Sequence, residues 1–402
     1  MHRLGISVYP EKSTQKEVYD YLELAAKYGF SRIFTCLLSV NDPKEKIMKD
    51  FGEFMDKAHS LGYVVAVDTN PEVFKHLGAT YSDLKPFHDM GVDIIRLDGS
   101  FGTTGDIQVT RNPYNIQIEF NGSMDQGVEL LLEQGGNKDQ VIICHNFFPE
   151  RYSGLDWNYF VNFNAYWKSL NLHTAAFVSS NQPHTHGPWN VFCGLPTVEI
   201  LRGLPIDLQA RLMLATGDVD DIIIGNAYAS EEELKALSEV DYQNICFKID
   251  EVEGLSDVEK EIIYDYYPHW DRYDHSSFFL RSSGSRVKYK NESIPHRETE
   301  QKMFHRGDVL IVNDNLAHYR GELEIALRDI PNDGERNLCG HVKEEEMMFL
   351  DMIEPGHYFK IITFKKRTLP TTSRVLSINN GESRLTTTHF FEFIALVHAI
   401  EQ

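Results

Sequence analysis

The chain has 402 residues, more than one small core requires, and this length suits one large domain with a smaller one. Its 42% hydrophobic and 25% charged residues are typical of a globular protein. A formal net charge of −21 argues against nucleic acid or an anionic membrane as the main partner, because such partners would be repelled.

Short apolar runs alternate with longer amphipathic runs through the first part of the chain. Helix patterns such as LELAAKYG, FGEFMDKAHSLG and DQGVELLLEQGG end in glycine and separate the apolar runs. Eight strands are predicted: Leu4–Val8, Arg32–Cys36, Tyr63–Asp68, Val92–Asp98, Asn115–Phe120, Val141–His145, His173–Val178 and Asp220–Gly225. Eight such units predict an α/β fold built on a TIM (β/α)8 barrel, with an open doubly wound sheet as the alternative.

Two connections depart from a regular pattern. GSFGTTGDIQVTRNPY has no helical stripe, so a short or degenerate crossover is expected there. A long insertion before the eighth strand contains PTVEILRGL and PIDLQARLMLATG, which predict two helices.

The composition changes after SEEELKALSEV, which ends near Val240. FFLRSS, DVLIVN, GELEIALRDI and YFKIITF are β-rich runs separated by turn signals such as NDN and NDG. We therefore predict a barrel over residues 1–240, a smaller β domain over 242–363, and a basic, Thr-rich tail over 364–402 that fits neither.

The N-terminus MHRLGISVYP enters a predicted strand without the pattern of a signal peptide, and no apolar run reaches eighteen residues. The five cysteines form no CxxC pair, which favours reduced thiols. A cytoplasmic location with no membrane partner is expected, and the oligomeric state is left open.

Three acids lie at the ends of neighbouring predicted strands: Asp68 closes YVVAVDTNP, Asp98 closes DIIRLDGSF, and Glu119 lies in NIQIEFNGS on the next strand. Functional groups of parallel barrels gather at this face, and carboxylates on adjacent strands can reach the separations that glycosidases use. One could act as general acid while another stays ionised. Each could instead cap a helix or pair with an arginine, and Arg96 could pair with either aspartate. We expect Asp98 and Glu119 to be catalytic, with Asp68 in reserve.

Polar groups at the other strand ends are candidates for binding substrate. CHNFFPERYSGLDW offers His145, Asn146 and aromatic rings that suit a sugar, and Asn121 follows the fifth strand. The loops after strands seven and eight of many barrels bind phosphate, and here they contain Ser179, Ser180, Gly225 and Asn226. Ser230 with Glu233 is also a plain capping box.

Histidines near these strand ends raise the idea of a metal site. His145, His173, His184 and His186 could hold Zn²⁺ or Mn²⁺ together with an aspartate. The chain has 17 histidines and no HExxH motif, so no metal and no cofactor is predicted.

Long motifs in the right order carry a family resemblance from Met1 to about Ile362. LGISVYP, FSRIFTCLLSV, RLDGSF, CHNFFPERYSGL, GLPTVEILRGLP and ATGDVDDIIIGNAYASEEEL closely resemble the bacterial 6-phospho-N-acetylmuramidases of the MupG type. The resemblance implies a TIM barrel followed by a cyclophilin-like β-barrel. It also implies an intracellular glycosidase of peptidoglycan recycling that separates N-acetylmuramic acid 6-phosphate from β-1,4-linked N-acetylglucosamine.

The resemblance supplies no catalytic residues, so the acids above rest on barrel geometry. Arg281 and Arg297 of the second domain could add positive charge for the phosphate or the lactyl carboxylate, or could form surface ion pairs. Two other functions stay open: a metal-dependent sugar-phosphate isomerase or epimerase, and a non-catalytic protein that binds muropeptide sugars. The tail after Phe364 departs from the family pattern.

Overall fold

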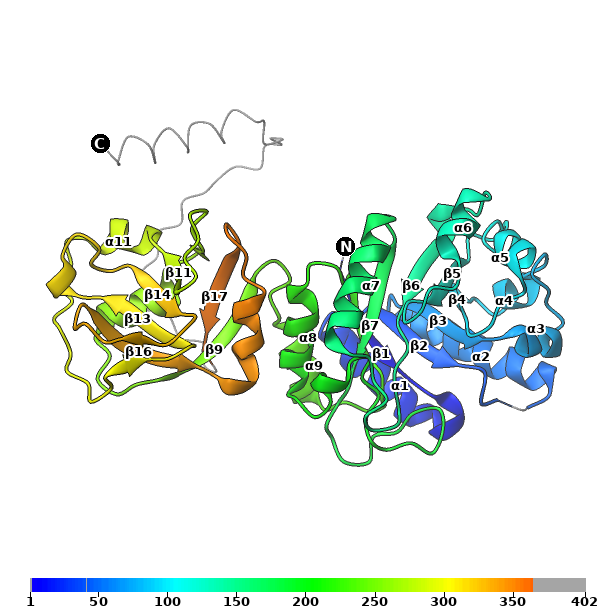
Figure 1. The fold of residues 1–402 in the computed structure, drawn as a ribbon. Coiled ribbons are helices and arrows are strands. Elements are labelled where there is room, and N and C mark those ends of the chain that lie inside the picture. The colour runs from blue at the N-terminus through cyan, green and yellow to red at the C-terminus, as the bar shows by residue number, and fades with distance from the viewer. Residues whose placement is uncertain (1, 41, 364–402) are drawn as a thin grey trace, which may run out of the picture. The chain divides into compact units, whose positions relative to one another are not determined.

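Eight parallel strands form a closed barrel in the order of the sequence (Figure 1). The computed structural model describes residues 2–40 and 42–363. The strands are β1 Arg3–Ser7, β2 Arg32–Cys36, β3 Val64–Thr69, β4 Ile94–Leu97, β5 Gln117–Asn121, β6 Val141–Cys144, β7 His173–Val178 and β8 Asp221–Ile224. β8 pairs with β1 in parallel and closes the sheet, which confirms the predicted TIM barrel and excludes the open sheet.

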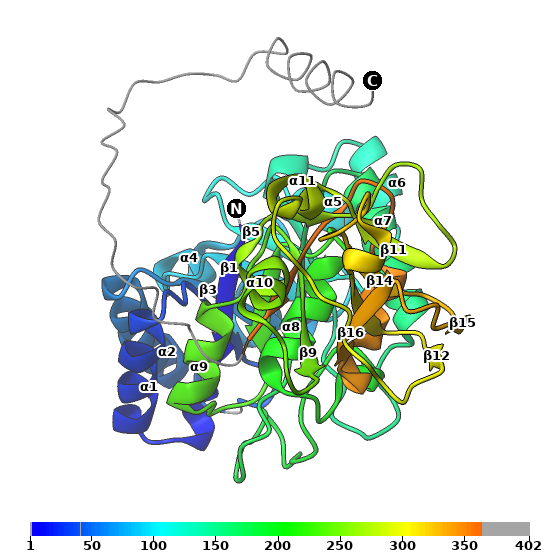
Figure 2. The same ribbon diagram turned by 90° about the vertical axis from the view of Figure 1, so that its left-hand side faces the viewer.

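Helices follow the strands and cover the outside of the barrel. They are α1 Gln15–Lys27, α2 Lys44–Ser60, α3 Pro71–Leu77, α4 Lys85–Asp89, α5 Thr103–Val109, α6 Val128–Glu133, α7 Trp157–Ser169, α8 Ile206–Ala215 and α9 Glu231–Ser238. Capping boxes begin α1, at Thr14 and Glu17, and α9, at Ser230 and Glu233. α9 lies beside α1, so the ring of helices closes where the barrel does (Figure 2).

One of the two irregular connections follows the prediction and the other differs in part. The crossover after β4 is short, since α5 has only seven residues. PIDLQARLMLATG forms α8, but the helix predicted for PTVEILRGL is wrong, because only the 3₁₀ turn η3 Glu199–Leu201 forms. The backbone of Thr197 is hydrogen-bonded to Phe177 and Leu155, so this segment runs beside the barrel instead of winding into a helix.

The second part of the described chain is a seven-stranded, mostly antiparallel sheet in the order β10-β17-β9-β16-β13-β14-β11. Its edge strands β10 and β11 lie next to each other, so the sheet is nearly a closed barrel. The strands are β9 Ile245–Glu251, β10 His269–Trp270, β11 Phe279–Ser282, β13 Asp308–Val312, β14 Leu323–Ala326, β16 Arg336–Val342 and β17 Tyr358–Ile362. Two short strands, β12 Met303–Phe304 and β15 Ile330–Pro331, form a separate pair.

Shorter elements complete the described part. In the barrel they are η1 Pro10–Lys12 and η2 Lys138–Gln140; beyond it they are α10 Asp257–Lys260, η4 Glu261–Asp265, α11 Gly284–Tyr289, η5 Asp314–Leu316 and η6 Glu344–Asp351. Arg211 of α8 donates two hydrogen bonds of 2.7 Å to Glu346 of η6. α9 ends at Ser238 and β9 begins at Ile245, while the division at residues 240 and 242 stays a prediction. The predicted tail, 364–402, lies outside the described residues.

Candidate active site

Two of the three predicted acids lie in one register row across β3, β4 and β5, and the third follows the end of β4. In the parallel register Asp68 of β3 pairs with Arg96 of β4, and Arg96 pairs with Glu119 of β5. Asp98 lies one residue beyond the end of β4, and its backbone N–H donates to the carbonyl of Thr69. The row therefore places a guanidinium between the carboxylates of β3 and β5.

Arg96 connects Asp68 with Asp98. Its Nη1 lies 2.8 Å from Asp68 Oδ1 and 3.8 Å from Asp98 Oδ1, and its Nη2 donates to Asn146 Oδ1. Since they share this atom, the two carboxyl oxygens lie at most about 7 Å apart, an upper bound that is compatible with the separation of about 5–5.5 Å in retaining glycosidases. Asp68, Arg96, Asp98 and Asn146 are called the carboxylate cluster below.

The two aspartates of this cluster have different surroundings. The side chain of Asp68 is 6% exposed, and that of Asp98 is 48% exposed. Burial raises the pKa of Asp68 to about 6, although Arg96 opposes this rise. Asp68 can therefore hold a proton close to neutral pH, while Asp98 meets solvent beside it, as a pair of unequal catalytic carboxyls requires.

Glu119 lies deeper than the sequence suggested. It stands two residues before the end of β5, its side chain is fully buried, and its Oε2 forms an ion pair with Arg32 Nη2. Strands of a barrel are staggered, so a register row descends toward the opposite end as it passes around the barrel. A carboxylate with no exposed surface cannot touch a substrate, so the structure favours Asp68 over Glu119 as the partner of Asp98.

Arg32 links Glu119 to residues at the N-terminal ends of the strands. Its Nη1 lies 2.6 Å from Asp221 Oδ2, and Asp221 also contacts Arg3 and His173. Burial raises the pKa of Asp221, but His173 and Arg32 outweigh that effect and hold it well below the usual range. We infer that this buried network of alternating charges stabilises the barrel and takes no part in catalysis.

Two predicted sugar-binding groups, His145 and Asn121, are largely occupied by contacts within the protein. His145 is buried between Ser123 and Asn164, and burial lowers its pKa to about 4, so its ring is neutral. Asn121 Oδ1 accepts from the backbone of Ser123. Both shape the loops after β5 and β6, and their contact with substrate stays a prediction.

Asn146 holds the loop after β6 against the carboxylate cluster. Its backbone donates to Ser123 Oγ and accepts from Thr197 Oγ1, and its Oδ1 accepts from Arg96. Among the described residues Asn146 Nδ2 makes no hydrogen bond, so this amide group is available beside the carboxyls.

The residues predicted to hold phosphate form a connected group between the loops after β7 and β8. Asn226 Oδ1 accepts from the backbone of Ser180 and from Ser179 Oγ, and Ser180 Oγ donates to Glu233. The carbonyl of Gly225 accepts a hydrogen bond of 2.6 Å from the phenol of Tyr9, and burial raises the pKa of this phenol. The four residues are brought together as expected, but these polar atoms bind each other, and their role in binding phosphate stays a prediction.

The two arginines predicted from the second domain form ion pairs there. Arg281 lies 2.8 Å from Glu322, and Arg297 lies 2.6 Å from Glu259. Both carboxylates are buried and need these partners. This agrees with the alternative reading of ion pairs, and a contact of either arginine with the substrate stays a prediction.

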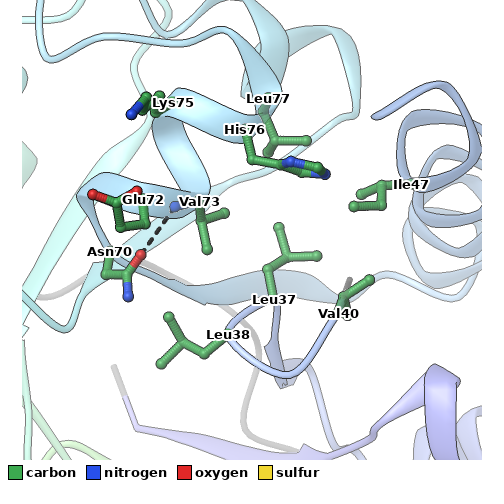
Figure 3. A pocket seen from close by; sticks show the side chains of 10 residues that line it. All are labelled: Leu37, Leu38, Val40, Ile47, Asn70, Glu72, Val73, Lys75, His76 and Leu77. Carbon is green, nitrogen blue, oxygen red and sulfur yellow. Dashed lines mark hydrogen bonds between the residues drawn. The ribbon is translucent and has the colours of Figure 1, made fainter. Parts of the chain in front are cut away.

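Two cavities open among the loops that follow the strands. One of about 590 Å³ lies between the loops after β2 and β3, where Asn70 caps α3 (Figure 3). Its wall combines six apolar side chains with the polar side chains of Asn70, Glu72, Lys75 and His76. The other, of about 530 Å³, lies between the loops after β6 and β7 and includes Ser179 and Ser180.

Exposed aromatic rings surround the loops after β6 and β7. Trp189 is 42% exposed and contacts Phe147, whose ring packs on Phe34 and Phe177 inside the barrel. Tyr152 and Phe192 are more exposed still and line the 530 Å³ cavity. Such rings suit the C–H faces of a sugar.

Glu11, in η1 after β1, is one carboxylate that the sequence reading missed. It accepts a hydrogen bond of 2.7 Å from Ser39 Oγ, and desolvation by the surrounding loops raises its pKa even though the residue reaches the surface. Its position three residues after Val8, where the first predicted strand ends, is the signal that could have identified it.

Neither a metal cluster nor a membrane-spanning helix occurs in the described part. Among residues 2–40 and 42–363, no three His, Cys, Asp or Glu side chains are arranged to hold a metal ion. None of the helices in these residues is long and apolar enough to cross a membrane.

Comparisons with known proteins agree with this arrangement. Family models described as 6-phospho-N-acetylmuramidase match the chain over residues 4–239, the N-terminal model, and over residues 245–362, the C-terminal model. The chain belongs to the 6-phospho-N-acetylmuramidase family. It is therefore a glycosidase, and its substrate is a phosphorylated amino sugar.

Solved structures support the membership. The crystal structure of an uncharacterized B. cereus protein is 38% identical, with a TM-score of 0.83, and the match covers 90% of this chain and 99% of that one. A conserved protein of unknown function from Enterococcus faecalis is 25% identical, with a TM-score of 0.65, and the match covers 90% and 96%. None of the curated proteins matches the chain.

Proposed function

We propose that this member of the family cleaves the β-1,4 bond between N-acetylmuramic acid 6-phosphate and N-acetylglucosamine with Asp68 and Asp98. The observation that carries this proposal is Arg96, which contacts one buried and one exposed carboxyl group at the ends of neighbouring strands. Asp68 is the general acid, because burial raises its pKa to about 6.

The proton balance of the reaction follows from these positions. Asp68 gives its proton to the glycosidic oxygen, and N-acetylglucosamine leaves with that proton. Asp98 faces the positive charge that develops at the muramic sugar. Water then adds to C1 of this sugar, and the proton that the water loses passes to the carboxyl pair, so that Asp68 is protonated again for the next turnover. Asp98 can act there as nucleophile, as base for the water, or by orienting the 2-acetamido group of the substrate.

Arg96 and Asn146 hold the cluster in position. The guanidinium of Arg96 fixes both aspartates, and the bond from Asn146 fixes the guanidinium. Asn146 Nδ2 is left to reach a sugar hydroxyl or the acetamido oxygen. The rings of Trp189 and Phe147 offer a surface on which a sugar can stack.

We further propose that the enzyme works in the cytoplasm, in the recycling of peptidoglycan fragments. The phosphorylated substrate class of the family supports this role, since a sugar phosphate is a substrate held inside the cell. The five cysteines are all free, which suits a reducing compartment.

The test is the release of N-acetylglucosamine from two substrates. The purified chain is expected to cleave the 6-phosphorylated disaccharide and to cleave the unphosphorylated one at least about 10-fold more slowly, because a charged contact is lost. The N-acetylglucosamine released from each disaccharide is measured by chromatography, and the measurement on the phosphorylated disaccharide is repeated in the presence of a chelator. Failure to release the sugar from the phosphorylated disaccharide would contradict the proposal, and loss of activity on chelation would favour metal-dependent chemistry.

A further inference from the structure

The residues that line the 530 Å³ cavity carry a net positive charge. It is lined by the loops after β6 and β7 and includes Arg151, Arg202 and Glu199 beside Ser179 and Ser180. Two cations and one anion leave an excess of one positive charge in a chain whose formal net charge is −21. Such a place can attract an anion despite the overall charge of the protein.

Arg202 and Glu199 use their charges to build the wall of the cavity. Arg202 donates to both carboxylate oxygens of Glu199 at 2.7 Å and to the carbonyls of Phe148 and Cys193. The hydrogen bonds from Arg202 lower the pKa of Glu199 to about 2, so Glu199 stays ionised and paired. Arg202 therefore fixes the loops and has little capacity left for a ligand.

Arg151 differs from Arg202 because its charge has no partner. It is exposed, and among the residues that the structure describes it makes neither an ion pair nor a hydrogen bond. The next residue, Tyr152, is fixed through its backbone N–H to Glu199 Oε1 at 2.7 Å. The backbone is thus anchored while the guanidinium remains available for a bidentate contact with an anion.

The loop that carries Arg151 also reaches the carboxylate cluster. It begins at Asn146, which is bonded to Arg96, and runs through Phe148, whose carbonyl is bonded to Arg202. Arg151 follows Asn146 by only five positions, so their Cα atoms lie at most about 18 Å apart. One short segment of chain therefore connects Arg151 with the carboxylate cluster.

From the free guanidinium, the positive cavity and the shared loop, we propose that Arg151 binds the 6-phosphate and sets the preference for phosphorylated substrate. The proposal rests on the proposed function and names the residue that recognises the phosphate. In the bound complex the guanidinium pairs with two phosphate oxygens, and Ser180 and its neighbours form the opposite wall of the cavity.

Steady-state kinetics of Arg151→Ala and Arg151→Lys on both disaccharides test the proposal. Arg151→Ala is expected to lower kcat/KM for the phosphorylated disaccharide by about 10- to 100-fold and to leave the unphosphorylated one within about 2-fold. Arg151→Lys is expected to restore part of the loss, because a single charge remains. Lys75→Ala is the matched control, since Lys75 is also exposed, lines the other cavity and has no ion pair among the described residues. An equal loss on both disaccharides, or no loss, would overturn the proposal.

Binding measurements separate this proposal from the proposed function and identify the anion. Calorimetry is done with N-acetylglucosamine 6-phosphate, which has the phosphate alone, and with N-acetylmuramic acid, which has the lactyl carboxylate alone. Arg151→Ala is expected to weaken binding of the first by about 10-fold or more and to leave the second unchanged. A loss confined to N-acetylmuramic acid, or a native protein that does not bind the phosphate sugar, would overturn it. An enzyme that binds the phosphate through Arg151 but cleaves neither disaccharide would contradict only the proposed function.

Discussion

Replacing Asp68 by Asn is expected to lower kcat for the phosphorylated disaccharide by about 10²- to 10⁴-fold, because Asn keeps the shape of the side chain but has no proton to give. In the native enzyme kcat/KM should fall as pH rises above about 6, where Asp68 loses its proton. The residual activity of Asp68→Asn should not show this fall of kcat/KM with rising pH. Rates measured between pH 4 and 9 on both proteins test the prediction.

The matched control for this variant is Glu119→Gln, which alters a carboxyl of the same register row without an exposed surface. Its kcat is expected to stay within about 10-fold of the native value and its pH profile to keep the fall above about pH 6. A loss of kcat as large as that of Asp68→Asn would indicate that Glu119 is a catalytic residue, as the sequence predicted.

Stability shows whether the loss of activity has a chemical cause. The pKa of Asp68 is raised in the folded protein to about 6, above the value of about 3.9 in an unfolded chain. Proton binding therefore favours the fold below about pH 4, and this contribution is lost as pH rises through 6. At pH 8 Asp68→Asn should unfold no more easily than the native chain.

Replacing Arg32 by Met is expected to give the largest loss of stability in the barrel, about 3–5 kcal/mol. The side chain is fully buried between Glu119 and Asp221, and its removal leaves Glu119 as a buried carboxylate without its arginine. The melting temperature of the barrel should fall by about 10 °C, as measured by circular dichroism.

A second substitution provides the control. Arg32→Met combined with Glu119→Gln also removes the carboxylate that has lost its arginine, while Asp221 keeps Arg3 and His173, and should recover part of the loss. The pKa of Asp221 is held below its unfolded value, so its contribution is present above about pH 4 and is lost as pH falls. The difference between native and Arg32→Met proteins should narrow in acid. An unchanged melting temperature in Arg32→Met would contradict this role of the network.

Local patterns were enough to predict the barrel. Apolar runs separated by amphipathic helices indicated all eight strands, and β2 and β7 have the predicted bounds. The capping box at Ser230 and Glu233 is present as well. PTVEILRGL was mistaken for a helix because its apolar spacing does not reveal that its backbone pairs beside β7. In the second domain β9 and β16 were not predicted from the sequence pattern.

The candidate site could be predicted only in part, because depth in a barrel depends on stagger. The sequence placed Asp68, Asp98 and Glu119 at one face, but the tilt that buries Glu119 beside Arg32 comes from the closed sheet. The partner of Arg96 was left open, and the structure places its Nη1 closer to Asp68 than to Asp98, at 2.8 Å against 3.8 Å. The sequence does not show that the charge of Arg151 has no partner, because this depends on Arg202 pairing with Glu199.

The most direct test of the central claim is a crystal structure of Asp98→Asn with the intact phosphorylated disaccharide. The account predicts that a carboxyl oxygen of Asp68 lies within hydrogen-bond distance of the glycosidic oxygen, about 2.6–3.2 Å, and that the amide introduced at position 98 faces C1 of the muramic sugar. A glycosidic oxygen in contact with a different acid, or a disaccharide bound away from Arg96, would contradict it.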